Sequence, residues 1–247
     1  MAFKKLKLTF YWFLLVISIF SPFGDRRPRS WKNKFGKSEI LNLESPIMKA
    51  SVILAHPYSK SFNHAIFNTV CSKLESFDST LFKHDLYQEK FDPVLTAPEL
   101  GSDASIDPLV NKYTQELIES DLLFFIHPNW WGQPPAILKG YIDRVIRPPH
   151  AYDFPPGDCG GGLPIRKLKA KYGVVFNTSN TEKEREENYF SDPLEKIWKQ
   201  CIFGFCGIEK YYRKMFRIIA DSTMDIRKMW LRDIEMIVEN AVKDVPL

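Results

Sequence analysis

The sequence predicts an α/β protein built on a doubly wound, five-stranded parallel sheet. Short runs of almost uninterrupted apolar residues, such as residues 50–55 and 122–126, are typical of strands buried on both faces. These runs alternate with segments in which apolar residues recur every three to four positions, as they do on one face of an α-helix. Such alternation over about 200 residues favours parallel strands with crossover helices on both faces of the sheet.

The first half of this alternation begins with a strand at residues 50–55. Asn63 is expected to be the N-cap of a helix that runs to about Phe77, because its side chain can accept a bond from a free backbone N–H. Residues 80–86 are expected as the second strand, and residues 91–101 as an irregular loop. A helix over residues 107–120 opens with Asp-Pro, and proline is tolerated in a first turn.

The second half repeats the alternation. Strands are expected at residues 122–126, 172–177 and 211–220, and helices at residues 135–146, 193–206 and 223–242. Residues 153–169 contain three consecutive glycines and three prolines, so an extended loop is expected there. Residues 178–191 are expected as a charged loop.

The first 48 residues differ in composition from the rest. They carry nine basic and three acidic side chains in a chain of net charge +4, so residues 49–247 are mildly acidic and give no case for nucleic-acid binding. Three lysines precede an apolar run, Leu8–Phe20, which is short for a bilayer span. The open alternatives are a dispensable extension before a start at Met48, a membrane anchor or targeting leader, and an ordered appendage. We expect a cytoplasmic protein that is membrane-associated or targeted if this extension is retained.

The four cysteines show no metal-binding or disulfide pattern. No Cys-x-x-Cys pair occurs, and Cys201 and Cys206 lack a histidine at zinc-finger spacing. Reduced and mostly buried thiols are therefore expected, and no metal site.

Three loops should meet at the carboxyl edge of the sheet, where ligands bind in doubly wound folds: residues 56–63, 127–135 and 178–191. The first leads into a helix N-terminus, which favours an anion, and His56, Ser61 and Asn63 add polar groups. A simple capped helix is the alternative. No Walker or G-x-G-x-x-G pattern occurs, so neither an NTPase nor a dinucleotide-binding Rossmann motif is indicated.

The second loop contains Trp130 and Trp131 beside prolines and a glycine. One of them is expected to cover a flat aromatic ligand, and the alternative is a tryptophan that plugs the strand ends. After the fourth strand, residues 177–181 form a cluster of small hydrogen-bonding side chains. Residues 182–187 are expected to be a solvated charge run.

Several motifs together resemble the NAD(P)H:quinone oxidoreductase (DT-diaphorase, modulator-of-drug-activity) family of flavodoxin-like proteins. The resemblance covers about residues 49–247. In chain order the motifs are Leu54-Ala55-His56, Ser61-Phe62-Asn63, Pro128 to Trp131, Pro135-Ala136-Ile137-Leu138-Lys139-Gly140-Tyr141-Ile142-Asp143-Arg144-Val145, Ala151-Tyr152 and Phe205-Cys206-Gly207.

The resemblance implies a tightly bound flavin and two-electron hydride transfer in ping-pong order, from NAD(P)H to a quinone or similar flat acceptor. It favours FAD, with FMN as the alternative, and a homodimer whose active site includes both subunits. The implied cofactor contacts are His56, Ser61, Phe62, Asn63, Pro128, Asn129, Trp130, Trp131, Thr178, Ser179, Ile219, Arg227 and Leu231. The implied acceptor pocket contains Tyr152 and Phe154, with His150 nearby.

The chain departs from the family pattern after the fourth strand. The family's Thr-Thr-Gly-Gly loop is Asn177-Thr178-Ser179-Asn180 here, without its two glycines. The tyrosine and histidine that relay charge on the flavin have no clear equivalents, and Arg185 and Tyr189 are candidates only. The catalytic residues are therefore left unassigned. A flavodoxin-like electron carrier and a non-enzymatic regulatory subunit of a membrane transporter are the alternative functions.

Overall fold

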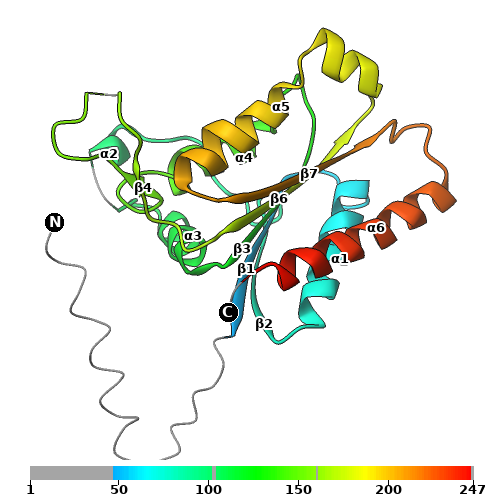
Figure 1. The fold of residues 1–247 in the computed structure, drawn as a ribbon, viewed down its shortest axis with the longest axis horizontal. Coiled ribbons are helices and arrows are strands. Elements are labelled where there is room, and N and C mark those ends of the chain that lie inside the picture. Colours follow the sequence, from blue (N-terminus) through cyan, green and yellow to red (C-terminus); the bar gives the residue numbers. More distant parts are fainter. Residues whose placement is uncertain (1–46, 102–103, 160, 246–247) are drawn as a thin grey trace, which may run out of the picture. The chain divides into compact units, whose positions relative to one another are not determined.

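The computed structural model describes residues 47–101, 104–159 and 161–245, and at their centre is a five-stranded sheet with the strand order β2-β1-β3-β6-β7 (Figure 1). All neighbouring strands in this sheet pair in parallel. The strands are β1 (Met48–Leu54), β2 (Ser79–Asp85), β3 (Leu122–Pro128), β6 (Tyr172–Ser179) and β7 (Lys210–Arg217). The predicted fold class is confirmed, and the change of direction in strand order lies beside β1 and β3.

Helices cover both faces of the sheet (Figure 1). On one face, α1 (Phe62–Glu75) and α6 (Met224–Lys243) pack on alternate strand residues such as Val52 and Phe124. On the other face, α3 (Pro108–Glu119), α4 (Ala136–Val145), α5 (Pro193–Lys196) and η3 (Ile197–Gly204) pack on Ile53 and Phe125. Successive residues of one strand thus enter two different cores, which explains the continuous apolar runs.

Short elements interrupt three segments that were expected as loops. A helical turn, α2 (Ala97–Leu100), lies within residues 91–101, and η2 (Arg185–Tyr189) lies within residues 178–191. In the glycine-rich segment, β4 (Tyr152–Asp153) pairs antiparallel with β5 (Ile165–Arg166). These elements are too short for hydrophobic periodicity to reveal them.

The cap of α1 corrects the sequence prediction. Ser61, and not Asn63, is the N-cap, and its Oγ accepts a hydrogen bond from the backbone N–H of His64 at 3.3 Å. Asn63 lies in the first helical turn, and its buried side chain donates to Thr178 Oγ1 at 2.8 Å. The helix expected to open at Asp107 is confirmed, and the Asp107 side chain caps it by accepting a bond from Leu109 N–H at 2.9 Å.

The N-terminal segment lies almost wholly outside the described residues. Met48 begins β1 and its side chain is only 2% exposed, whereas the apolar run at residues 8–20 is not described. Among the helices of the described ranges, none has both the length and the apolar character of a membrane crossing. All four cysteines are free thiols, Cys71 and Cys206 buried and Cys159 and Cys201 exposed.

Candidate functional site

A cleft of about 460 Å³ opens at the carboxyl edge of the sheet. It is bounded by the β1–α1 loop, the ends of β3 and β6, the segment after β7 and the start of α6. The structure brings together in it all the expected cofactor contacts except Trp131 and Leu231. The lining residues are His56, Tyr58, Lys60, Ser61, Phe62, Asn63, Pro128, Asn129, Trp130, Thr178, Ser179, Asn180, Thr181, Ile219 and Arg227.

One end of the cleft suits an anion. It contains the start of α1, where the first backbone N–H groups of a helix have no partner within the helix and the dipole is positive. Lys60 and Arg227 add positive charge to the lining. The Arg227 guanidinium is held in place because it donates to Ile219 O and to Ser222 Oγ, each at 2.8 Å.

His56 lines the same end as a neutral ring. Its Nδ1 accepts the backbone N–H of Tyr58 at 3.1 Å, and burial lowers its pKa below the ordinary value. Trp130 lies beside it, with 6.1 Å between the ring centroids. The imidazole can therefore pack against a ligand or donate a hydrogen bond through Nε2.

Below the cleft, a buried histidine fixes the start of the tryptophan loop. His127 Nε2 accepts bonds from Trp198 Nε1 at 3.0 Å and from Asn177 Nδ2 at 2.9 Å. An indole N–H can only donate, so the ring proton lies on Nδ1, which donates to Pro128 O at 2.8 Å. Burial lowers the pKa of His127 to about 4, and the ring is therefore neutral.

Of the three buried amide oxygens without a partner in the described part of the chain, two belong to residues that line the cleft and the third belongs to Asn177. Asn63 Nδ2 donates to Thr178, and Asn129 Nδ2 donates to Glu186 Oε1 at 3.0 Å. The carboxylate accepts only, which fixes the orientation of the Asn129 amide. The buried Oδ1 atoms of Asn63 and Asn129 then have no donor. Because unpaired buried acceptors are costly, these residues suit a ligand that brings N–H or O–H groups.

Trp131 is presented on a strained two-residue turn. Trp130 and Gln133 exchange backbone hydrogen bonds of 3.1 and 3.0 Å, and between them Trp131 and Gly132 have φ values of 57° and 69°. The left-handed conformation costs a non-glycine residue about 1 kcal/mol. It leaves the Trp131 indole fully exposed, and Trp130 is 42% exposed. The alternative in which a tryptophan plugs the strand ends is therefore wrong for Trp131.

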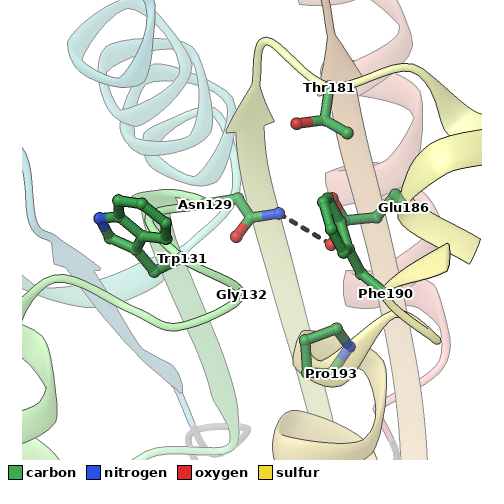
Figure 2. Close-up of a pocket in the computed structure, with 7 residues that line it drawn as sticks. All are labelled: Asn129, Trp131, Gly132, Thr181, Glu186, Phe190 and Pro193. Carbon is green, nitrogen blue, oxygen red and sulfur yellow. Dashed lines mark hydrogen bonds between the residues drawn. The ribbon is translucent and has the colours of Figure 1, made fainter.

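A second hollow, of about 520 Å³, lies beside the cleft and shares Asn129 and Thr181 with it. In Figure 2, Asn129 lies between the Trp131 indole and Glu186, and Phe190 and Pro193 lie on the Glu186 side. The Glu186 side chain is almost fully buried, so the prediction of a solvated charge run is wrong for this residue. Arg185 and Tyr189, the candidate relay residues, are exposed and line neither hollow.

Glu186 is a functional candidate that sequence reasoning missed. It lies in η2, whose wider helical turn points this carboxylate inward while its charged neighbours point outward. A single apolar residue nearby, Phe190, is too little to reveal an inward face by periodicity.

The expected acceptor residues lie apart from the cleft within one chain. The Tyr152 ring packs edge-on against Phe154 and Phe205, with centroids 5.6 and 5.0 Å away. Tyr152 lines a separate hollow of about 480 Å³ that also contains Arg147. His150 is half-buried and lines none of these hollows.

Leu231 also lies outside the cleft. It is on α6, partly buried, and packs against the core beneath that helix. The structure thus places Ile219 and Arg227, but not Leu231, in the cleft.

Comparisons with known proteins agree with this geometry. A family model described as "Flavodoxin-like fold" matches residues 48–226. An uncharacterized NAD(P)H oxidoreductase of Haemophilus influenzae is 31% identical over 176 residues, which cover 68% of this chain and 83% of that protein. A ribosyldihydronicotinamide dehydrogenase [quinone] of Rattus norvegicus is 31% identical over 227 residues, 81% of this chain and 94% of that protein.

Among solved structures, Smu.1420 from Streptococcus mutans UA159 is 31% identical. The match has a TM-score of 0.68 and covers 78% of this chain and all of that one. The chain therefore belongs to the flavodoxin-like fold family, among its NAD(P)H:quinone oxidoreductase-like members.

Proposed function

We propose that this chain is a flavin-dependent NAD(P)H oxidoreductase that reduces quinones or similar flat acceptors by two-electron hydride transfer in ping-pong order. The observation that carries the proposal is the cleft at the strand ends, which joins an anion site at the start of α1 to a loop with unpaired acceptors and exposed tryptophans. The relatives named as NAD(P)H oxidoreductase and quinone-dependent dehydrogenase support it.

The residues present fit a flavin. Its phosphate groups suit Ser61, Lys60 and the free N–H groups of α1, and the N–H and hydroxyl donors of the flavin suit the unpaired oxygens of Asn63 and Asn129. The flavin, when bound, supplies the hydride chemistry, and the protein positions it and excludes water. We propose FAD, with FMN as the alternative, because Ile219 and Arg227 extend the same cleft beyond the phosphate end.

The second hollow is the proposed place for the flat ring of the donor or acceptor. Trp131, Phe190 and Pro193 supply apolar walls, and Glu186 supplies a hydrogen-bond acceptor at the boundary with the cleft. The Tyr152–Phe154 cluster, with His150 nearby, lies apart from both hollows in one chain. We therefore propose a homodimer in which this cluster of one subunit closes the acceptor site of the other.

Two alternative functions can be distinguished from this proposal by experiment. An electron carrier without nucleotide turnover, or a regulatory subunit of a membrane transporter, would bind flavin without steady-state oxidation of NAD(P)H.

We propose a cytoplasmic enzyme for residues 49–247. Membrane association through residues 1–48 is tested by the mass of the mature N-terminus, since a native protein that starts at Met48 lacks that segment.

The test is flavin binding followed by turnover. The purified protein should be yellow, chromatography of the extracted cofactor should identify FAD or FMN, and NADH or NADPH should be oxidised with menadione. Asn63→Ala should weaken flavin binding about tenfold, because it removes the donor to Thr178 and a cleft acceptor. Asn68→Ala, on the exposed side of the same helix, is the matched control and should bind as the parent does. A colourless protein that refuses both flavins would refute the proposal.

A further inference from the structure

Three side chains beside the cleft form a continuous series of hydrogen-bonding contacts. Ser61 Oγ lies 3.0 Å from His64 Nδ1, and His64 Nε2 lies 3.0 Å from Asp85 Oδ2. Ser61 lines the cleft, whereas the side chains of His64 and Asp85 are only 15% and 13% exposed. The carboxylate at the end of β2 is thereby connected to the anion site through one imidazole.

The contacts determine where the protons lie. An ionised carboxylate only accepts, so His64 Nε2 carries the proton that points to Asp85. In the neutral imidazole, Nδ1 then has no proton and accepts the hydroxyl proton of Ser61. Ser61 Oγ already accepts the His64 backbone N–H at 3.3 Å. In this state the Ser61 hydroxyl offers the cleft only lone pairs, which repel an anion.

Protonation of His64 reverses the direction of this contact. One proton from solvent binds Nδ1, which then donates to Ser61 Oγ, and the Ser61 hydroxyl proton becomes free to donate to an anion in the cleft. We infer that His64 is a positioning residue that couples binding of the flavin phosphates to the uptake of one proton, with Asp85 stabilising the imidazolium. This inference rests on the proposed flavin function.

The other charged groups near His64 do not replace it in this role. His56, on the β1–α1 loop, faces it at 6.3 Å between ring centroids, but its Nδ1 is already bonded to Tyr58 N–H. Glu89 lies behind Asp85, whose backbone N–H it accepts at 3.1 Å. Lys60 lines the cleft itself.

The experiment is calorimetric titration of the flavin-depleted full chain with FAD, in buffers of different ionisation enthalpy. The pyrophosphate diester of FAD has no ionisation near neutral pH, so proton uptake reports on the protein. Uptake of up to one proton is expected, with FAD affinity rising by up to about tenfold for each unit that the pH falls. Riboflavin, which lacks phosphate, should bind without proton uptake.

Two variants separate the coupling from mere packing. His64→Gln should abolish proton uptake and weaken FAD binding while leaving riboflavin affinity unchanged. In Asp85→Asn, the bonds from Tyr87 and Gln88 N–H hold the side-chain oxygen, so the new NH₂ group faces His64 Nε2. The neutral ring then carries its proton on Nδ1 and releases the Ser61 hydroxyl. This variant should bind FAD tightly, without proton uptake and independently of pH.

The control is His56→Gln, which should retain the proton uptake of the parent. Three results would each overturn the inference. They are proton uptake that persists in His64→Gln, proton uptake that disappears in His56→Gln, and proton uptake that accompanies riboflavin binding. A parent protein that binds FAD with no proton uptake overturns the inference alone. A parent that binds neither FAD nor FMN overturns the proposed function and this inference with it.

Discussion

Trp198 and Trp131 lie at the same edge of the sheet and have opposite surroundings. Trp198 is fully buried, packs 4.6 Å from Phe125 between ring centroids, and donates its indole N–H to His127. Trp131 is fully exposed on a left-handed turn only four residues after His127. Trp198 belongs to a buried cluster with His127 and Asn177, called the floor here, and Trp131 belongs to the strained turn at residues 130–133, called the rim. We infer from this difference that the buried cluster around Trp198 stabilises this edge of the sheet, and that the exposed turn with Trp131 serves ligand binding.

The largest expected effect is on the floor. Trp198→Ala should lower the free energy of unfolding by about 3–5 kcal/mol, because it opens a cavity and removes a donor from His127. Urea denaturation measures this. Trp131→Ala is the matched control and should change the unfolding free energy by less than about 0.5 kcal/mol. Equal losses of unfolding free energy in the two variants would contradict this separation of roles.

Low pH should lower the free energy of unfolding through protonation of His127 in the floor. Its folded pKa, about 4, is below the ordinary value near 6.5, so the unfolded chain binds the proton first as pH falls. The stabilisation is complete above about pH 6.5 and is lost as pH falls toward 4, by about 3 kcal/mol in total. Because carboxylates titrate in the same range, the measurement is the pH dependence of unfolding in the parent minus that in His127→Asn. No difference between the two slopes would contradict this assignment.

The smallest expected effect in free energy is on the rim, and there it concerns function. Trp131→Ala should lower flavin retention or turnover about tenfold, which corresponds to about 1.4 kcal/mol, at nearly unchanged stability. Flavin fluorescence titration and NAD(P)H oxidation measure the two quantities. Trp198→Ala, assayed at a temperature where it remains folded, should lose less of either. The reverse order would place the chemistry in the floor.

Apolar periodicity was sufficient for the sheet and for the loops that border the cleft, whereas the individual contact residues came from the resemblance to the quinone oxidoreductase motifs. The five strands and the loops at their carboxyl ends follow from runs that feed two cores, and those loops contain most of the expected contacts. The N-cap of α1 was missed because Ser61 and Asn63 are both good cap residues by type. Their roles differ only through Thr178, which is distant in the chain and binds Asn63.

Glu186 was missed for a related reason. Its burial depends on a wide helical turn and on Asn129, which lies 57 residues earlier in the chain. The separation of Tyr152 and Phe154 from the cleft likewise depends on the β4–β5 pair, which has too few residues to leave a pattern. The burial of Glu186 and the position of the Tyr152–Phe154 cluster depend on contacts between short segments far apart in the sequence. Composition and periodicity do not reveal such contacts.

The fixed amide of Asn129 has a consequence for which molecules the site admits. Glu186 holds the NH₂ end, so the oxygen end points away from this carboxylate, toward Trp131 and Gly132 in Figure 2. A group that approaches this oxygen is favoured if it donates a hydrogen bond and disfavoured if it is an anion. The hydrogen bond from Asn129 to Glu186 thus decides which end of the amide is left without a partner.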